Sequence, residues 1–483
     1  MSNQAASISL KSPISPALAS SAPAAKPNPA AAARTKLLLE GPIVATLLRL
    51  AAPNVVVNVI LIAVTATVDA HFVGRLGGDG LAGLSLVFPL IMLMQQMANS
   101  SMGGAIASAV ARAIGAGKHE DASALVVHAV VIAAGAAAIF SGVLWFGGPA
   151  IYGLMGGKGA ALAAALEYSN AIFAGAFAYW LLSTFTSIVR GAGQAAVLAV
   201  VYIAAEALHI ALVPVLMFGF GPLPALGITG AGVATVLSFT ASTLVLAWYI
   251  ATGRTAVRLS LRGVKLSRRL FVEILRVGAP MSLQPILNNM ALATFTGYVG
   301  VLGAPALAAF GAAVRLEYLI YPLAFGLGAG VLGMVGTNIG AGNKVRATRI
   351  TWTAAALAGI VTGILGLFGF TAPGLWTVLF SVTPEVQTLA GGYLMIVSLA
   401  YPFIGLGLTL GTACQAAGRP LWVILGISGR ALTVAGGGWL AVHVLGGGLA
   451  GLALVGAAGM AVYGLGLATA VWSGEWLRPR ASR

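Results

Sequence analysis

The chain has 483 residues, of which 59% are hydrophobic and only 8% are charged, and its mean hydropathy is +0.97. A water-soluble protein of this length could not cover its surface with so few charges, so lipid must surround most of the chain. The net charge of +15 does not indicate nucleic-acid binding, because the basic residues fall in short segments between long apolar runs.

The first 41 residues precede the first apolar run. Residues 1–36 are rich in Ala, Ser and Pro and contain few large apolar side chains. Such a composition cannot bury a core, so we expect a disordered cytoplasmic tail over residues 1–41. The tail also lacks the apolar stretch typical of a cleaved secretory signal.

Apolar runs of about 20 residues then recur along the chain, each long enough to cross ~30 Å of hydrocarbon as a helix. Lipid offers no partner to an open strand edge, so the runs predict helices. The sequence therefore predicts an all-α integral membrane protein with twelve transmembrane helices. The expected spans are 44–68, 81–103, 122–146, 162–187, 195–218, 228–251, 277–299, 306–332, 350–370, 387–412, 421–443 and 449–472.

The basic residues orient these spans. An even number of spans places both termini on one side, and 22 of the 26 Lys and Arg residues fall in the tails and loops of that side. Only Arg75 and Lys158 lie on the other side, whereas Arg315 and Arg430 fall within spans. Because cytoplasmic loops carry the excess of Lys and Arg, both termini are expected in the cytoplasm.

The two halves of the sequence repeat each other. Four ordered blocks match at an offset that drifts only from 227 to 225 residues. The clearest matches are Ala113–Gly117 with Asn338–Gly342, and Arg190–Gln194 with Gln415–Arg419. Six spans per half predict parallel repeats related by an axis along the membrane normal.

This repeat predicts two pseudo-symmetric six-helix bundles with a central cleft between them. The expected domains are the tail 1–41, an N-lobe 42–251, a cytoplasmic linker 252–276, a C-lobe 277–472 and a C-terminal cytoplasmic tail 473–483.

Three carboxylates fall within or at the edge of a span, where an ionised group costs several kcal/mol: Asp69, Glu206 and Glu317. Glu206 and His209 share one face of the fifth span, and we predict that the pair takes up and releases a proton. A static hydrogen bond that pins helix packing is the alternative for this pair, and an interfacial carboxylate in contact with water is the alternative for Asp69.

Glu317 shares a helix face with Tyr321 but not with Arg315, two residues before it. It therefore has either a transport role or a structural one, and Arg315 is interpreted as structural. Pro53 and Pro280 occupy equivalent places in the first and seventh spans and are expected to kink them. Glu317 and Tyr321 are candidate substrate-binding residues. The other candidates for substrate binding are polar side chains within spans: Gln95, Asn99, Tyr179, Asn288 and Asn289.

Cys414 is the only cysteine, which excludes an intrachain disulfide and a cysteine-based metal cluster. Gly115–Lys118 and its counterpart at Gly340 lack the full pattern of a phosphate-binding loop. We therefore expect no ATPase within the chain, no cofactor and no metal site. No paired catalytic set is evident, so an enzyme is not expected.

Several segments together resemble the multidrug and toxic compound extrusion (MATE) family. They include Leu50–Pro53, Val68–Gly77, Arg112–Gly117, Leu226–Thr235 and Arg315–Glu317, and the resemblance covers residues 42–472. It implies export of bulky, often cationic compounds in exchange for protons or sodium ions, with Asp69 as the coupling carboxylate of the first span. Two departures from the family pattern occur: His209 and Val213 replace its Asn and acidic residue, and Asn288-Asn289 stand where some members have Glu.

The sequence thus predicts a secondary active multidrug exporter that exchanges organic cations or drugs for protons by rocker-switch alternating access. Coupling through Asp69, Glu206 and His209 is preferred. The alternatives are a sodium-coupled exporter and a flippase for lipids or lipid-linked oligosaccharides. We expect a monomer in the bacterial inner membrane, in contact with lipid and not with nucleic acid.

Overall fold

The structure is a computed structural model that describes residues 29–75, 78–257, 265–380 and 383–478, except the side chains of residues 31, 56–67, 69 and 70. Within these residues the chain is helical, and the only β feature is an isolated bridge between Phe220 and Leu223. The all-α prediction is confirmed.

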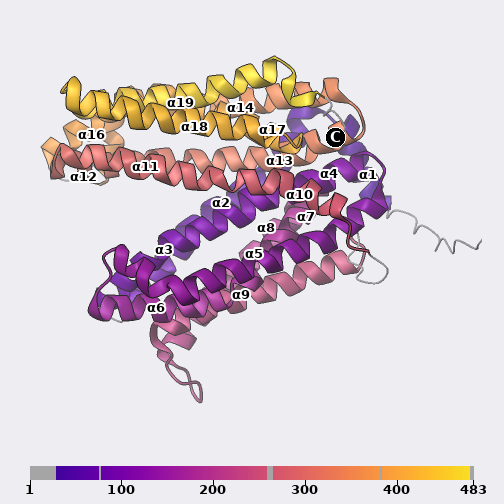
Figure 1. The fold of residues 1–483 in the computed structure, drawn as a ribbon, viewed down its shortest axis with the longest axis horizontal. Helices are drawn as coiled ribbons and strands as arrows, with labels where there is room; N and C mark the ends of the chain where they lie inside the picture. The colour runs from indigo at the N-terminus through magenta and orange to yellow at the C-terminus, as the bar shows by residue number, and fades with distance from the viewer. Residues whose placement is uncertain (1–28, 76–77, 258–264, 381–382, 479–483) are drawn as a thin grey trace, which may run out of the picture.

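Figure 1 shows two bundles of long helices, one from each half of the chain. The N-lobe contains α2 (Ile43–Gly74), α3 (Gly78–Gln96), the π-helix η1 (Met97–Met102), α4 (Gly103–Gly115), α5 (His119–Leu154), α6 (Gly159–Ala174), α7 (Ala176–Gly191), α8 (Ala195–Phe218) and α9 (Gly227–Ala251). The C-lobe contains α10 (Arg268–Met281), α11 (Leu283–Val301), α12 (Ala304–Tyr318), α13 (Ile320–Gly340), α14 (Lys344–Thr371), α15 (Pro373–Thr377), α16 (Pro384–Val397), the 3₁₀ turn η2 (Ser398–Ala400), α17 (Tyr401–Ala416), α18 (Pro420–Trp439), the π-helix η3 (Leu440–Val444) and α19 (Gly448–Trp472).

Ten helical segments of the described chain are long and apolar enough to cross a membrane, and the pair α6–α7, bent by 47°, makes up to eleven. Helix α2 occupies the position of the first expected span. In its described part, the stretch that counts as an apolar helix is Ile43–Val55, which is too short to cross a membrane. The count of twelve therefore stays a prediction.

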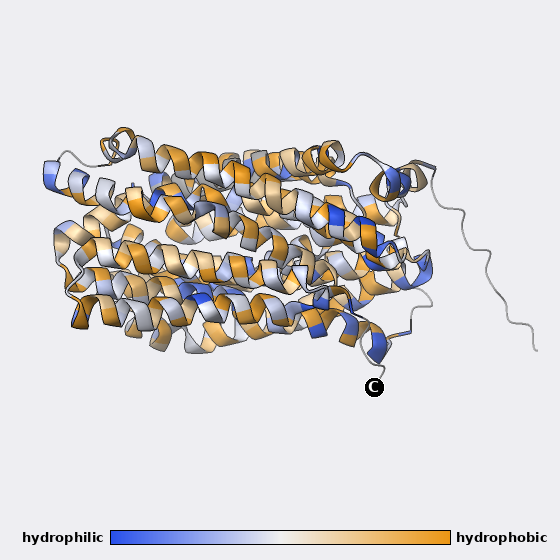
Figure 2. Cartoon of the chain, turned by 90° about the horizontal axis from the view of Figure 1, so that it is seen from above, coloured by the Kyte–Doolittle hydropathy of each residue, from blue (hydrophilic) through white to orange (hydrophobic). Residues whose placement is uncertain are grey.

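Hydrophilic residues gather at the end of the molecule that holds the C-terminus (Figure 2). We call this the basic end, defined by Arg112, Lys118, Arg269, Lys344 and Arg419. The ribbons of the two lobes meet there and diverge toward the opposite end (Figure 1).

The repeated sequence blocks fold alike. Gly117, Gly342, Gly193 and Gly418 all have positive φ, between 72° and 79°. In each block the glycine N–H donates to the carbonyl three residues before it, and the next N–H donates to the carbonyl five residues before it. This is the Schellman helix end, which needs a left-handed residue and therefore favours glycine. The same helix end occurs at four places because the sequence block itself is repeated.

The lobes cross closely at the basic end, where α4 packs on α13. A Cβ on Gly115 would lie 2.0 Å from the Thr337 carbonyl oxygen, and a Cβ on Gly340 would lie 2.1 Å from that of Arg112. Arg112 and Thr337 are themselves equivalent at the 225-residue offset. The contact is therefore two-fold symmetric, as expected for parallel repeats.

Three segments differ from the sequence prediction. Residues 29–40 of the expected disordered tail form helix α1 (Pro29–Glu40), whose Leu38 side chain is buried. The expected linker is already helical from Arg268, where α10 begins. In the C-terminal tail, Trp476 lies buried in the short turn η4 (Glu475–Leu477). Buried apolar side chains order all three segments, a tertiary effect that composition does not reveal.

The two prolines at equivalent places of the repeat behave differently. Pro280 lies in the last turn of α10, and the helix breaks at Ser282 before α11 begins. In contrast, α2 continues through Pro53 to Gly74. Arg268–Val301 nevertheless counts as one candidate span, and α2 has no break at Pro53, so the kinks expected at the two prolines stay predictions.

Candidate functional site

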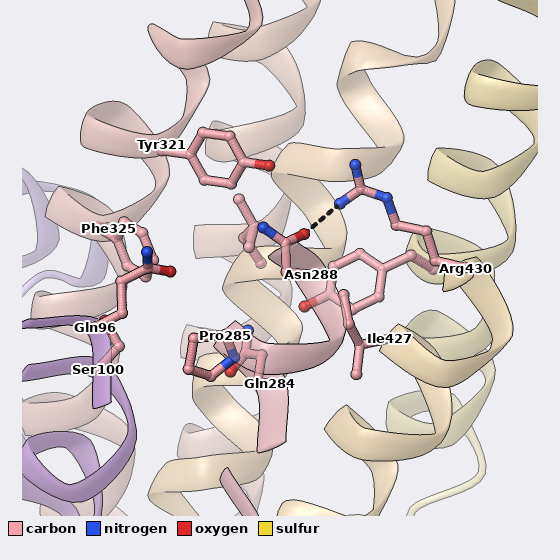
Figure 3. Close-up of a pocket in the computed structure, with 11 residues that line it drawn as sticks. Gln96, Ser100, Gln284, Pro285, Asn288, Tyr321, Phe325, Ile427 and Arg430 are labelled. Atoms are coloured by element: carbon pink, nitrogen blue, oxygen red, sulfur yellow. Dashed lines mark hydrogen bonds between the residues drawn. The ribbon is translucent and has the colours of Figure 1, made fainter. Parts of the chain in front are cut away.

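A pocket lies between the lobes (Figure 3). The N-lobe contributes Gln96 and Ser100. From the C-lobe come side chains of α11, α13, α17, α18 and α19: Gln284, Pro285, Asn288, Tyr321, Phe325, Leu408, Ile427, Arg430 and Tyr463.

Arg430 is the only charged side chain among these eleven. One of its N–H groups donates to the Asn288 side-chain oxygen at 3.2 Å, and Tyr321 interacts with the same guanidinium. Figure 3 shows the side chain reaching from α18 toward Asn288 on α11. The arginine thus holds together helices that are far apart in sequence and keeps a positive charge at the pocket wall.

Glu317 does not line the pocket. Its carboxylate accepts a hydrogen bond from the Tyr393 hydroxyl at 3.4 Å and interacts electrostatically with Arg430. The two residues come from α12 and α18, so no sequence spacing brings them together. Arg315, which the sequence analysis interprets as structural, is exposed, and its guanidinium carbon lies 4.9 Å from the centre of the Phe380 ring.

Two of the predicted substrate-binding residues, Asn288 and Tyr321, line this pocket. Gln95 and Asn289 do not, although Gln96 and Asn288 beside them do. Asn289 is exposed and donates to the Pro285 carbonyl of its own helix at 2.8 Å. Neighbouring helical residues point about 100° apart, so one residue of each adjacent pair faces the pocket.

Three polar lining residues were not predicted as substrate-binding: Ser100, Gln284 and Arg430. A polar residue in an apolar span was the available signal for each of them. For Ser100 that signal is obscured by η1, because a π-helix adds a residue to the turn and rotates the residues after it.

Asn99 and Tyr179 connect η1 to α7 and do not line the pocket. The Asn99 amide donates to the Tyr179 hydroxyl at 2.6 Å, and the Ser183 hydroxyl donates to the Asn99 side-chain oxygen at 3.0 Å. Tyr179 is 6% exposed and packs on Phe239. These contacts indicate that the pair stabilises the N-lobe, and its predicted role in substrate binding stays a prediction.

Replacing Tyr179 by Phe is expected to lower stability by about 1 kcal/mol, because the Asn99 amide loses its acceptor in a partly buried place. The check is the thermal unfolding midpoint of the purified protein in detergent. Tyr318→Phe is the control, since that side chain is 49% exposed. Equal midpoints for Tyr179→Phe and Tyr318→Phe would contradict the stabilising role.

The second site lies in the N-lobe, on α8. Glu206 and His209 are 7% and 3% exposed, and a Glu206 carboxylate oxygen lies 3.6 Å from His209 Nδ1. On the other side of the ring, Nε2 lies 3.2 Å from the Thr235 hydroxyl on α9. The predicted pairing of Glu206 with His209 is present in the structure.

The hydroxyl of Thr235 lies between the Ala231 carbonyl, at 3.0 Å, and His209 Nε2, at 3.2 Å. When it donates to the carbonyl it acts as acceptor toward His209, and Nε2 then carries a hydrogen. A neutral His209 then presents an unprotonated Nδ1 to Glu206. The proton between the carboxyl group and Nδ1 can reside on either residue.

Asp69, the third predicted coupling residue, belongs to α2, which packs against α8. Its side chain lies outside the described part of the structure. Phe72 and Phe218 are in ring contact at 6.3 Å near the ends of the two helices. At 1.5 Å per residue, the backbone of Asp69 is therefore displaced by about 13 Å along the helices from that of Glu206.

Comparison with known proteins identifies the family. The MatE family model matches residues 55–215 and 280–434, once in each lobe. A protein named FAD transporter from Shewanella oneidensis is 25% identical over 394 residues, which cover 80% of this chain and 84% of that protein. A probable multidrug resistance protein NorM from Thermotoga maritima is 26% identical over 379 residues, 78% of this chain and 80% of that one.

The same fold occurs among solved structures. A MOP superfamily transporter from Pyrococcus furiosus superposes with a TM-score of 0.83 at 24% identity, over 92% of this chain and 99% of that one. The family model, matched in both lobes, covers more than half of the chain. This chain is therefore a multi-pass membrane protein that belongs to the MatE family of transporters, whose members include multidrug exporters.

Proposed function

We propose that this chain exports organic compounds from the bacterial cytoplasm in exchange for protons. The observation that carries the proposal is the buried Glu206–His209 pair in α8. An ionisable pair in a membrane helix costs free energy, and such residues typically mark an ion or proton path.

Three protonation states of this pair differ in charge. With one shared proton the pair is neutral, with a second proton it is cationic, and with none it is anionic. Uptake or loss of one proton therefore changes the charge of a buried site without moving the backbone. Such a change alters the relative free energy of two arrangements of the surrounding helices, which is the requirement for coupling.

Asp69 completes the proposed path. It lies five residues before the end of α2, nearer the end opposite the basic end, and Glu206 lies about 13 Å deeper. We propose that protons enter at Asp69 and reach the Glu206–His209 pair by a second step. The i, i+3 spacing of Glu206 and His209 places this second site on the face of α8 that contacts α9.

If the basic end is cytoplasmic, as the distribution of Lys and Arg predicts, the present arrangement is closed toward the cytoplasm. Several side chains hold this closure across the lobes. Gln415 of α17 donates to the Ser100 and Ser101 carbonyls at 2.9 and 3.1 Å, and Arg112 of α4 donates to the Ala416 carbonyl at 2.8 Å. Rocker-switch export requires these contacts to break and re-form in each cycle.

Two alternatives remain distinct. Sodium coupling would need a cage of oxygen ligands, and the described part of the C-lobe places Glu317 beside Tyr393 and Arg430, a cationic neighbour that disfavours a metal ion. A flippase for anionic lipid carriers would favour several cationic side chains in the cleft, whereas one, Arg430, lines the pocket. The named cargo of the relatives, FAD in one and drugs in others, shows that substrates vary within the family.

The proposal is tested with the full chain in proteoliposomes. The probes are rhodamine 6G, a cation that represents the predicted substrate class, and carboxyfluorescein, an anion with the same xanthene ring. A pH gradient without sodium is expected to drive dye movement, a sodium gradient at uniform pH is not, and Asp69→Asn is expected to abolish the pH-driven part. The proposal is contradicted if a sodium gradient alone drives transport, or if neither gradient drives the transport of either dye.

A further inference from the structure

We propose that the pocket between the lobes binds the acidic group of an aromatic organic anion, a carboxylate, sulfonate or phosphate, with Arg430 as its anchor. The inference rests on the proposed transport function and names a substrate class for it. It departs from the expectation of organic cations, because of the charge that the structure places at the pocket wall.

The first reason is the set of hydrogen-bond donors around Arg430. A guanidinium has five N–H donors in a planar fork that matches a carboxylate or a phosphate. The Asn288 oxygen accepts one of them. Gln96 and Ser100 of the N-lobe and Gln284 of α11 add neutral polar groups to the lining of the same pocket. A ligand with acceptor oxygens satisfies these donors, whereas a cation meets a like charge.

The second reason is the position of Glu317. Glu317 interacts electrostatically with Arg430, and it does not line the cavity. Within the described residues no acidic oxygen lies within 4.0 Å of the Arg430 guanidinium, the distance that defines an ion pair. Glu317 therefore reduces the cost of keeping Arg430 ionised in the membrane and leaves the guanidinium accessible to a ligand.

The third reason is the aromatic wall. Tyr321 and Phe325 lie one turn apart on α13 with their ring centres 6.4 Å apart and their planes at 28°, and Tyr463 faces the same pocket. Figure 3 shows Tyr321 and Arg430 on the same side of the cavity. A flat aromatic ring bearing an acidic group can contact both at once.

The pocket also joins the lobes. Gln96 and Ser100 belong to the N-lobe, and the other lining residues belong to the C-lobe. A ligand bound here contacts both lobes, so movement of one lobe relative to the other changes its binding site. This placement agrees with a substrate site and not with a structural cavity inside one bundle.

The test is equilibrium binding to the purified full chain in detergent, without any ion gradient, measured by fluorescence anisotropy. Carboxyfluorescein is the anionic probe and rhodamine 6G the cationic probe. Arg430→Gln is expected to weaken carboxyfluorescein binding about tenfold or more, since it removes a charge-assisted hydrogen bond. The affinity of Arg430→Lys for carboxyfluorescein is expected to lie between those of the wild type and of Arg430→Gln. Lysine keeps the positive charge but lacks the planar fork of N–H donors.

Glu317→Gln gives the opposite expectation. It removes the competing negative charge and should tighten carboxyfluorescein binding several-fold. If Arg430 and Glu317 only stabilised the fold, Arg430→Gln and Glu317→Gln would each weaken the binding of both dyes. Asn288→Ala is expected to weaken the anionic probe, and Asn289→Ala, at the adjacent residue outside the pocket, is the matched control.

Three results would overturn the inference. Carboxyfluorescein binding could be unchanged in Arg430→Gln, Arg430→Gln could lose affinity for both dyes equally, or the wild-type protein could bind rhodamine 6G and not carboxyfluorescein. Competition separates the source of the acidic group. Benzoate or phenyl phosphate is expected to displace the probe, and displacement only by short-chain phosphatidylglycerol would show a lipid site and overturn the proposal. Because binding is measured without a gradient, its failure leaves the proton-coupling experiment unaffected, and the reverse also holds.

Discussion

Replacing Gly115 or Gly340 by Ala is expected to prevent the lobes from closing at the basic end. The added Cβ would lie 2.0 or 2.1 Å from a backbone carbonyl oxygen of the other lobe, far inside van der Waals contact. A backbone oxygen cannot move aside as a flexible side chain does. Overpacking of this kind costs about 1–3 kcal/mol or more, so the closed population should fall about tenfold, since 1.4 kcal/mol is a factor of ten.

The measurement is the distance between spin labels on Lys118→Cys and Lys344→Cys at the basic end. Both positions are exposed; Lys118 immediately precedes α5, and Lys344 begins α14. Either glycine variant is expected to shift the distribution to longer distances, and the transport rate should fall with it. Cys414 is buried, which limits background labelling.

The double variant is expected to add little to the single ones. Both methyl groups push the same two helices apart, so the first separation removes most of the second clash. Gly135→Ala is the control, because a Cβ there meets nothing within 4 Å. An unchanged distance distribution in both single variants would show that α4 and α13 do not form the closure.

Replacing Glu206 by Gln is expected to abolish proton coupling while leaving the fold intact. Gln keeps the shape and the hydrogen-bonding groups but cannot release a proton. For exchange of one proton per substrate, one pH unit is worth about 1.4 kcal/mol and supports about a tenfold substrate gradient. Under the same pH gradient, the ratio of dye concentrations on the two sides of the membrane should therefore stay near one in this variant.

Thr235→Val tests the partner of the pair. It removes the hydroxyl that contacts His209 Nε2 and thereby a group that orients the ring, while Glu206 stays in place. Transport should persist with an altered pH profile. Ser238→Ala is the matched control on α9, because the Ser238 hydroxyl bonds only to its own helix at Ala234 among the contacts described for it. A normal pH profile in Glu206→Gln would exclude this pair from coupling.

Much of the fold was accessible from composition and repetition. The apolar runs predict the helices because lipid requires every backbone group to be paired within a helix. The block around Gly117 and its counterpart at Gly342 predict matching helix ends because only glycine adopts the left-handed conformation without strain. Both features are local, so the sequence alone suffices for them.

The same distinction between local and tertiary features applies to the two sites. Glu206 and His209 were predicted as a pair because their spacing on one helix already places them on one face. The identity of the pocket residues was not predictable in this way. Helices that are apolar all round leave their rotation undetermined, so nothing in the sequence distinguishes Gln96 from Gln95 or Asn288 from Asn289.

The sequence by itself therefore determined the helical class, the two-fold repeat and the pairing of Glu206 with His209 within a single helix. Tertiary structure decided the rest: the approach of Gly115 to Thr337, the ordering of α1, and the meeting of Arg430 with Asn288 and, at longer range, Glu317. The physical reason is that each of these depends on how helices from distant parts of the chain rotate and pack against one another, and packing is a property of the assembled bundles.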